Sequence, residues 1–431
     1  MIVMGGIIGS GIFINPYVVA QHLHHPLLIL GAWAVGGLIA LAGAFIYAEL
    51  AALRPDVGGQ YAYIREALHP SVAFIYGWTL LLVVQSGGMA AVAITFARYF
   101  LELTQLRIAD WTVAIIALGV LTLINCMGVR SGSNVQSALM VLKILAIAAL
   151  IVCGLTVDSE WSVLSGQRSA SGVATTAFDT SIIAPFGAAM VPVLFAYGGW
   201  QNSGFVAGEM RQPRRDLPRG LLIGVAGVIV LYLLVNFVCL HALGPEGLAK
   251  TSTPASEVMW LALGEKGRRI IAVGIAISTL GFLSGGMLTA PRVYFAMADD
   301  GLFFKSVAWL HPRVRVPVIA IALQGALAVV IATSGRYEQI LNYVVSVDSL
   351  FFGLTAVCLF SLRKHAAVTA TEGRSYALRV NSSVIVMFAL AEWLVAASAI
   401  YKDPGNSGIG LGILLAGIPV YVFWQRRRAH G

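Results

Sequence analysis

Charged residues are scarce in this sequence. Asp, Glu, Lys and Arg make up 11% of the 431 residues, whereas hydrophobic residues make up 58%. A soluble globular protein carries about 25% charged residues, because its whole surface faces water. The composition therefore excludes a water-soluble globular protein and favours a chain whose outer surface faces lipid.

Features of nucleic-acid-binding and metal-binding proteins are also missing. The sequence has no run of five or more like charges, and its net charge of +8 is typical of a membrane protein with basic cytoplasmic loops. The four cysteines form no C-x-x-C motif and no Cys/His pattern with metal-ligand spacing. We therefore expect no nucleic-acid partner, no disulfide, no metal site and no cofactor.

Catalytic signatures are absent as well. The sequence contains neither an H-E-x-x-H nor a G-x-S-x-G motif, and no histidine falls in a predicted helix core except His241, which lies near an end. No ring-forming filter motif of a channel is visible either. The chain is therefore predicted not to be an enzyme, and a channel is disfavoured.

The sequence instead contains long apolar stretches separated by Pro, Gly and charged residues. Ala114–Asn125, Leu139–Thr156 and Leu221–Leu240 reach or approach the roughly 20 residues that cross a bilayer. We predict an all-α integral membrane protein with about 12 transmembrane helices and no soluble domain. The predicted helices cover 1–22, 27–53, 70–103, 110–128, 133–157, 182–210, 217–243, 266–298, 317–333, 338–362, 382–401 and 408–425.

The distribution of basic residues predicts the orientation. With the N-terminus in the cytoplasm, 18 of the 28 Lys and Arg residues fall in cytoplasmic loops and nine in outer loops or outer helix ends. Positive charge concentrates on the cytoplasmic side of membrane proteins. We therefore expect both termini in the cytoplasm, a multi-pass protein of the cell inner (cytoplasmic) membrane, and a short basic cytoplasmic tail over 426–431.

Glycine interrupts two of the predicted helices near their middle. The first helix carries Gly9-Ser10-Gly11, and the sixth carries Gly198-Gly199-Trp200, 189 residues later. Two interrupted helices in corresponding positions of two halves are typical of inverted-repeat transporters. This pattern predicts a single transporter domain over 1–425, with repeat one over about 1–157, repeat two over about 182–362 and peripheral helices over 382–425. The alternative is that these glycines only allow close helix packing.

Unwound backbone in a membrane needs a polar partner. Free N–H and C=O groups cannot remain unpaired against lipid, so they are tolerated around a cavity or a bound ligand. The start of the half-helix after Gly11 would present free N–H groups and the positive end of a helix dipole to an anion. Carbonyls at the breaks would accept hydrogen bonds from a cation. A zwitterion such as an amino acid fits both.

Several motifs in order along nearly the whole chain resemble one family. They are Gly5-Gly-Ile-Ile-Gly-Ser-Gly-Ile-Phe-Ile-Asn-Pro16, Tyr47-Ala-Glu-Leu50 with Pro55, Gly58-Gly59 and Tyr61-Ala-Tyr63, Phe195-Ala-Tyr-Gly-Gly-Trp200, Glu209-Met-Arg-Gln-Pro213 with Leu217-Pro-Arg219, and Ala290-Pro-Arg292 through Asp300-Gly301. The sequence resembles the amino acid–polyamine–organocation (APC) superfamily of permeases, and most closely its L-amino-acid transporter branch. The resemblance implies the leucine-transporter-like fold, a 5+5 inverted repeat with broken helices 1 and 6 plus two peripheral helices.

The resemblance also implies a substrate site at the two breaks. Ser10 and Gly11 would bind the substrate carboxylate, and backbone carbonyls of helices 1 and 6 would bind the α-amino group. Phe195 would close over the substrate as a gate, unless it is an ordinary buried aromatic residue. The implied substrate-binding set is Ile7, Gly9, Ser10, Gly11, Phe195, Ala196, Gly198, Trp200 and Gln201.

Ionisable residues within the apolar helices are further candidates, because charge in a membrane is costly. Lys143 corresponds to a family lysine that occupies the space of a coupling sodium ion, which implies sodium-independent transport; it could also carry a coupling proton. The alternative is that Lys143 extends its ammonium to the membrane interface. Asp348 is a weaker candidate for proton coupling, Glu49 is predicted to be structural, and Glu392 has no predicted role.

The predicted function is therefore secondary active transport of amino acids by alternating access, through exchange or proton symport. Neutral amino acids are favoured, because the predicted pocket region carries no acidic side chain that would select a cationic substrate. A polyamine or cationic amino acid permease and a substrate-sensing membrane receptor on the same fold remain alternatives. The expected partners are the amino acid substrate and the lipid bilayer; no accessory subunit is evident, and a homodimer stays open.

Overall fold

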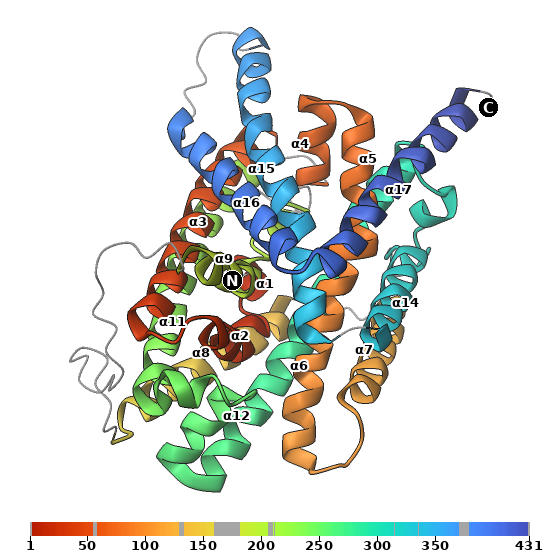
Figure 1. Cartoon of the computed structure of the whole chain (residues 1–431). Coiled ribbons are helices and arrows are strands. Elements are labelled where there is room, and N and C mark those ends of the chain that lie inside the picture. The colour runs from red at the N-terminus through yellow and green to blue at the C-terminus, as the bar shows by residue number, and fades with distance from the viewer. Residues whose placement is uncertain are drawn as a thin grey trace.

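Helices make up nearly all the secondary structure in the computed structural model (Figure 1). The structure describes residues 2–54, 58–128, 133–158, 182–205, 210, 212–313, 315–334, 336–369 and 379–429. Up to residue 158 the elements are α1 (Ile2–Ile7), α2 (Gly11–His22), α3 (Pro26–Leu53), α4 (Gln60–Ala67), α5 (Pro70–Thr79), the π-helix η1 (Leu80–Gln85), α6 (Ser86–Thr104), α7 (Asp110–Cys126) and α8 (Ser133–Leu155). From residue 182 they are α9 (Ile183–Tyr197), α10 (Asn202–Phe205), α11 (Pro213–Leu248), α12 (Pro254–Thr289), α13 (Pro291–Asp299), the 3₁₀ helix η4 (Lys305–Ala308), α14 (Val318–Ser334), α15 (Tyr337–Thr369), α16 (Ser382–Lys402) and α17 (Pro404–Ala429).

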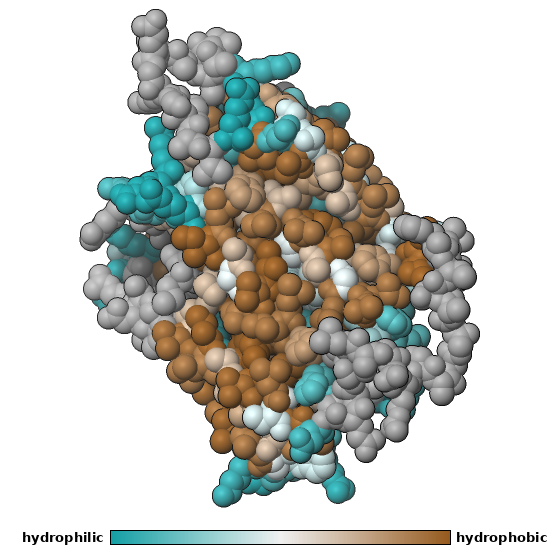
Figure 2. Space-filling model, turned by 90° about the vertical axis from the view of Figure 1, so that its left-hand side faces the viewer, coloured by the Kyte–Doolittle hydropathy of each residue, from teal (hydrophilic) through white to brown (hydrophobic). Residues whose placement is uncertain are grey.

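The length and composition of these helices suit a bilayer. Among the described residues, eight helical stretches are long and apolar enough to cross a membrane, and three shorter apolar helices accompany them. Large apolar side chains such as Leu38, Ile223 and Met387 are exposed on the outside of the bundle. Figure 2 shows that hydrophobic side chains cover the middle of one face, whereas hydrophilic side chains gather towards its upper and lower ends. The prediction of an all-α integral membrane protein is confirmed for the described part of the chain.

Two details of the helices differ from the prediction. The predicted helices 217–243 and 266–298 leave residues 244–265 as a connection between them. In the structure α11 continues to Leu248 across a kink at Gly244, and α12 begins at Pro254 and kinks at Gly264. Both glycines have a positive φ, which a helix does not contain, so the helix changes direction at each of them. In the predicted helix 70–103, the six residues of η1 adopt the wider π-helical turn. Such π segments are frequent at functional sites.

Two of the sequence motifs contact each other outside the spanning helices. The Tyr61 hydroxyl on α4 donates to the Asp300 carboxylate, 2.7 Å away, at the end of α13. Arg65, one turn further along α4, forms an ion pair with the same carboxylate. Burial, together with the hydrogen bond to Asp300, raises the pKa of the Tyr61 hydroxyl, so this group remains a donor at neutral pH. These contacts join the segment after α3 to the end of α13.

Candidate functional site

Both predicted breaks are present. α1 ends at Ile7 and α2 begins at Gly11, while α9 ends at Tyr197 and α10 begins at Asn202. In the second break Gly198 is extended and Gly199 has a φ of +101°, which L-residues with a Cβ rarely adopt. The prediction that glycines interrupt these two helices is confirmed.

The two breaks lie against each other. A Cβ atom added to Gly199 would stand 2.1 Å from the carbonyl oxygen of Gly6, and one added to Gly11 would stand 2.6 Å from the Cα atom of Ala196. Both distances are shorter than any van der Waals contact, so only glycine lets the backbones approach this closely. These glycines therefore also allow close helix packing, as the alternative explanation holds. This close packing brings the two breaks together.

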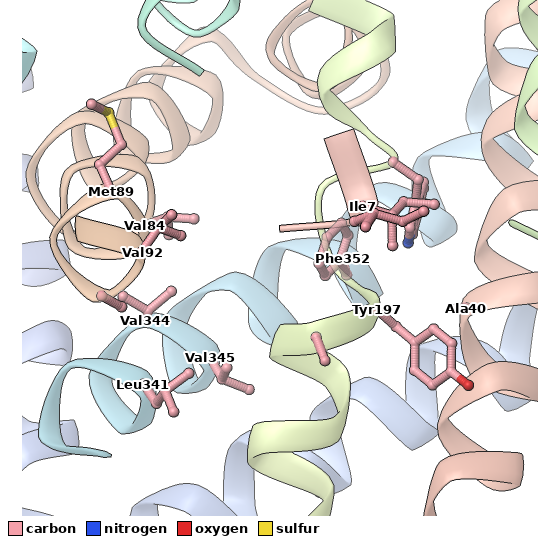
Figure 3. Packing of buried hydrophobic residues seen from close by; sticks show 14 of the residues in the cluster. Ile7, Ala40, Val84, Met89, Val92, Tyr197, Leu341, Val344, Val345 and Phe352 are labelled. Atoms are coloured by element: carbon pink, nitrogen blue, oxygen red, sulfur yellow. The ribbon is translucent and has the colours of Figure 1, made fainter. Parts of the chain in front are cut away.

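A buried cavity of about 100 Å³ opens where the breaks meet. Figure 3 shows Val84 and Val92 on one side of this region, Val344 and Val345 on a second, and Ile7 with Phe352 on a third. The cavity is lined by every residue of the predicted substrate-binding set and by Asp348: Ile7, Gly9, Ser10, Gly11, Phe195, Ala196, Gly198, Trp200, Gln201 and Asp348.

The start of α2 presents hydrogen-bond donors to this cavity. The first N–H groups of a helix have no partner within the helix, and they lie at the positive end of its dipole. The Ser10 side chain is 1% exposed, and its hydroxyl has no hydrogen-bond partner among the described residues. Buried polar groups without a partner are uncommon in folded proteins. This end of the cavity can therefore bind an anionic group such as a carboxylate.

The carbonyl groups at the breaks are partly engaged already. The Ile7 carbonyl accepts from Gly9 N at 2.7 Å and from the Tyr232 hydroxyl at 3.1 Å. The Gln201 Oε1 atom accepts from Gly199 N at 2.8 Å, so this side chain stabilises the second break besides lining the cavity. An α-amino group at Ile7 would have to share the carbonyl with these donors.

Lys143 is tied to the first break and does not line the cavity. Its side chain is 4% exposed, and its Nζ atom donates to the Ile8 carbonyl at 2.8 Å. The same ammonium lies 5.7 Å from the centre of the Phe282 ring, which lines the cavity. The ammonium therefore points to the unwound backbone between α1 and α2.

Two acidic side chains line the cavity, which contradicts the prediction of a pocket without them. Asp348 lies on α15 and Glu392 on α16, and both contribute to the cavity wall. Sequence reasoning placed α16 at the periphery, where a carboxylate would not reach the site. The helix packs along α15 and also contacts α9 and α3, and this packing carries Glu392 inward.

Other cavity residues were missed entirely. Phe282 on α12 covers the first break, since a Cβ atom at Gly9 would lie 3.0 Å from its ring. Phe352 on α15 and Gln85 at the end of η1 complete the wall. A phenylalanine in an apolar helix carries no sequence signal for a site, whereas Glu392 did, because a carboxylate in such a helix is unusual.

Glu49 holds the helix ends together, in agreement with its predicted structural role. The Arg363 guanidinium donates to both carboxylate oxygens of Glu49, each at 2.7 Å, and Val380 N donates to one of them at 2.7 Å. The contact joins α3, α15 and the segment before α16. The motif residues Pro55, Glu209 and Arg211 lie outside the described residues.

A bundle of long apolar helices, in which two broken helices border one cavity, defines a membrane transport protein. The sequence matches the amino acid permease family over residues 1–423. The chain belongs to this family, in the L-amino-acid transporter branch of the APC superfamily. It is therefore a permease and not an enzyme, as the missing catalytic motifs predicted.

Curated relatives cover almost the whole chain. The serine/threonine exchanger SteT of Bacillus subtilis (strain 168) is 31% identical over 441 residues, which span 99% of this chain and 95% of the relative. The human large neutral amino acids transporter small subunit 2 is 29% identical over 445 residues, spanning 99% of this chain and 79% of the relative. The human cystine/glutamate transporter is 28% identical over 434 residues, spanning 99% and 84%.

Proposed function

We propose that this permease moves amino acids across the cytoplasmic membrane by alternating access, without sodium, through exchange or proton symport. The observation that carries the proposal is the meeting of both broken helices at one buried cavity. At that cavity the N-terminal end of α2 and the unpartnered Ser10 hydroxyl face a space lined by backbone polar groups. A zwitterionic α-amino acid matches these donors and acceptors.

The architecture that we propose is a twelve-span bundle with a 5+5 inverted repeat. Helix packing supports it: α2 packs on α9, α3 on α11, α6 on α12 and α7 on α14. If α1–α2 and α9–α10 are the first and sixth spans, each of these pairs joins helices five spans apart. Residues 1–425 would then be one domain, with α16 and α17 as the peripheral helices. The excess of basic residues supports cytoplasmic termini.

In this proposal the substrate carboxylate binds at Ser10 and Gly11. The α-amino group binds the carbonyls of Ile7, Phe195, Ala196 and Gly198. Phe195 would close over the substrate as a gate, because its ring lines the cavity directly beside the second break. Trp200 and Gln201 would contact the substrate side chain. All of these residues border one space, as a single ligand requires.

Lys143 supports the absence of sodium coupling. Carbonyls freed at broken helices are the groups that bind sodium in transporters of this architecture. The Ile8 carbonyl accepts instead from the Lys143 ammonium, so a fixed cation occupies this position. A coupling proton on Lys143 or Asp348 is the corresponding proposal for symport.

The names of the relatives bear on exchange and on partners. SteT is named an exchanger, which favours exchange for this chain. The human relative named a small subunit indicates that related chains assemble with a larger subunit. An accessory subunit is not evident in this sequence, and a homodimer also stays open.

Uptake of a radiolabelled amino acid mixture into proteoliposomes in sodium-free buffer tests the proposal. Uptake only into vesicles that contain unlabelled amino acid would identify an exchanger. Uptake into empty vesicles that follows an imposed pH gradient would identify a proton symporter. If folded protein supports neither, or if uptake requires sodium, the proposed mechanism is wrong.

A further inference from the structure

The carboxylates of Asp348 and Glu392 have no basic partner. They line the same cavity from two helices that pack against each other, α15 and α16. None of the residues lining this cavity is Lys, Arg or His, and no ion pair between described residues reaches either carboxylate. The Glu49 carboxylate, in contrast, is paired with Arg363. Neither of the two acidic groups thus has a basic side chain beside it among the residues that line the cavity, and the Lys143 ammonium is bonded to the Ile8 carbonyl.

Glu392 is in addition deeply buried, and one of its two carboxylate oxygens lacks a partner. Its side chain is 4% exposed, and its Oε2 atom has no hydrogen-bond partner within the described part of the chain. A carboxylate removed from water is normally paired with a cation or saturated with hydrogen bonds. A bound positive group in the cavity would provide the missing partner.

An aromatic wall lies beside the carboxylates. Trp200 and Phe352 both line the cavity, and their rings stack with centres 5.3 Å apart. Tyr47 packs edge-on against Trp200, with ring centres 4.6 Å apart, and so holds the indole in place. Ammonium and guanidinium groups are attracted both to carboxylates and to the faces of such rings. The wall and the carboxylates therefore favour the same kind of group.

The groups that line the cavity differ in their chemistry. The start of α2 with Ser10 presents donors, which suit the α-carboxylate, while Asp348 and Glu392 present acceptors from α15 and α16. A zwitterion bound at the breaks would leave the acceptors on α15 and α16 unpaired. A substrate with a second positive group on its side chain would provide partners for the donors and for these acceptors.

We propose that Asp348 and Glu392 form a subsite for a cationic side chain, so that the permease carries cationic amino acids such as lysine, ornithine and arginine. This inference rests on the proposed amino acid transport at the same cavity. It replaces the expectation of neutral substrates, which depended on a pocket without acidic side chains.

Binding of radiolabelled L-lysine to the purified protein in sodium-free buffer tests the subsite. L-norleucine has the aliphatic chain of lysine without the terminal ammonium, and citrulline is a neutral analogue of arginine. We expect lysine and arginine to compete at least about tenfold better than these two analogues, since one charge-assisted contact is worth about that factor or more.

Variants of the two carboxylates test whether these residues cause the preference for a cationic side chain. Asp348→Asn and Glu392→Gln should each weaken lysine binding about tenfold or more while changing norleucine binding less than about twofold. Glu338→Gln is the matched control, because it removes a carboxylate from the same helix as Asp348 but away from this cavity. It should leave both affinities unchanged.

The outcomes separate the two proposals. Binding of norleucine as tight as that of lysine overturns the cationic subsite and leaves amino acid transport standing. Loss of proton-driven uptake of neutral amino acids in both variants, with no change in selectivity, also overturns it, since the pair would then hold a proton. Failure to bind any amino acid overturns the proposed function itself. The comparison of lysine with norleucine on the wild-type protein tests the cationic subsite even if a variant does not fold.

Discussion

A single methyl group at Gly199 should disrupt the contact between the two broken helices. In Gly199→Ala the new Cβ atom would lie 2.1 Å from the Gly6 carbonyl oxygen, and the residue would keep a φ of +101°. Left-handed backbone costs an L-residue roughly 1–2 kcal/mol, and overpacking of a tight interior costs typically about 1–3 kcal/mol. We expect the free energy of unfolding to fall by about 2–5 kcal/mol, as the sum of these two effects.

Gly198 provides the matched control, because it is the neighbouring residue in the same break. Its φ is −65°, and a Cβ atom there would come no closer than 3.4 Å to another atom. Gly198→Ala should therefore destabilise the protein much less than Gly199→Ala. Unfolding midpoints of the two purified variants, together with substrate uptake in proteoliposomes, check the prediction. Equal stability of the two variants, with uptake retained in Gly199→Ala, would refute the idea that the two breaks need a bare backbone at their crossing.

Three further predictions concern polar groups. Ser10→Ala should weaken substrate binding roughly twofold to tenfold, since one hydrogen bond is worth about 0.5–1.5 kcal/mol. It should not lower the unfolding midpoint, because this hydroxyl has no partner among the described residues. Unchanged affinity in a binding titration would contradict the role of Ser10 in substrate binding. Lys143→Met should abolish or strongly reduce sodium-free uptake, because the Ile8 carbonyl loses the ammonium that fixes the first break. Uptake by this variant at the wild-type rate would show that transport does not need the contact between Lys143 and Ile8. Glu49→Gln should lower the free energy of unfolding by about 3–5 kcal/mol, the usual cost of removing one charge from a buried ion pair, because the Arg363 guanidinium then keeps only neutral partners such as the Val380 carbonyl. Thermal unfolding in detergent measures the change, and a loss below about 1 kcal/mol would show that the neutral partners and water satisfy the guanidinium.

The membrane class and the two breaks follow from local properties of the chain. The long apolar stretches can only be hidden in lipid or in each other, whatever the arrangement of the helices. Gly199 marks a break because it alone can adopt its backbone conformation at low cost, and that property needs no tertiary contact. Glu49 and Lys143 were likewise recognisable, since a charged group in an apolar helix must find a partner or a function.

The composition of the cavity was decided only by the tertiary structure. Ile8 and Lys143 are 135 residues apart in the chain, yet their atoms lie within hydrogen-bond distance. Phe282 reaches the first break from α12, and Glu392 enters the wall from a helix that the repeat pattern leaves outside the core. No local pattern encodes such contacts, because they depend on how helices far apart in the sequence pack and rotate against one another. The sequence by itself thus determined where the backbone opens, whereas helix packing decided which side chains, and how many carboxyl groups, surround that opening.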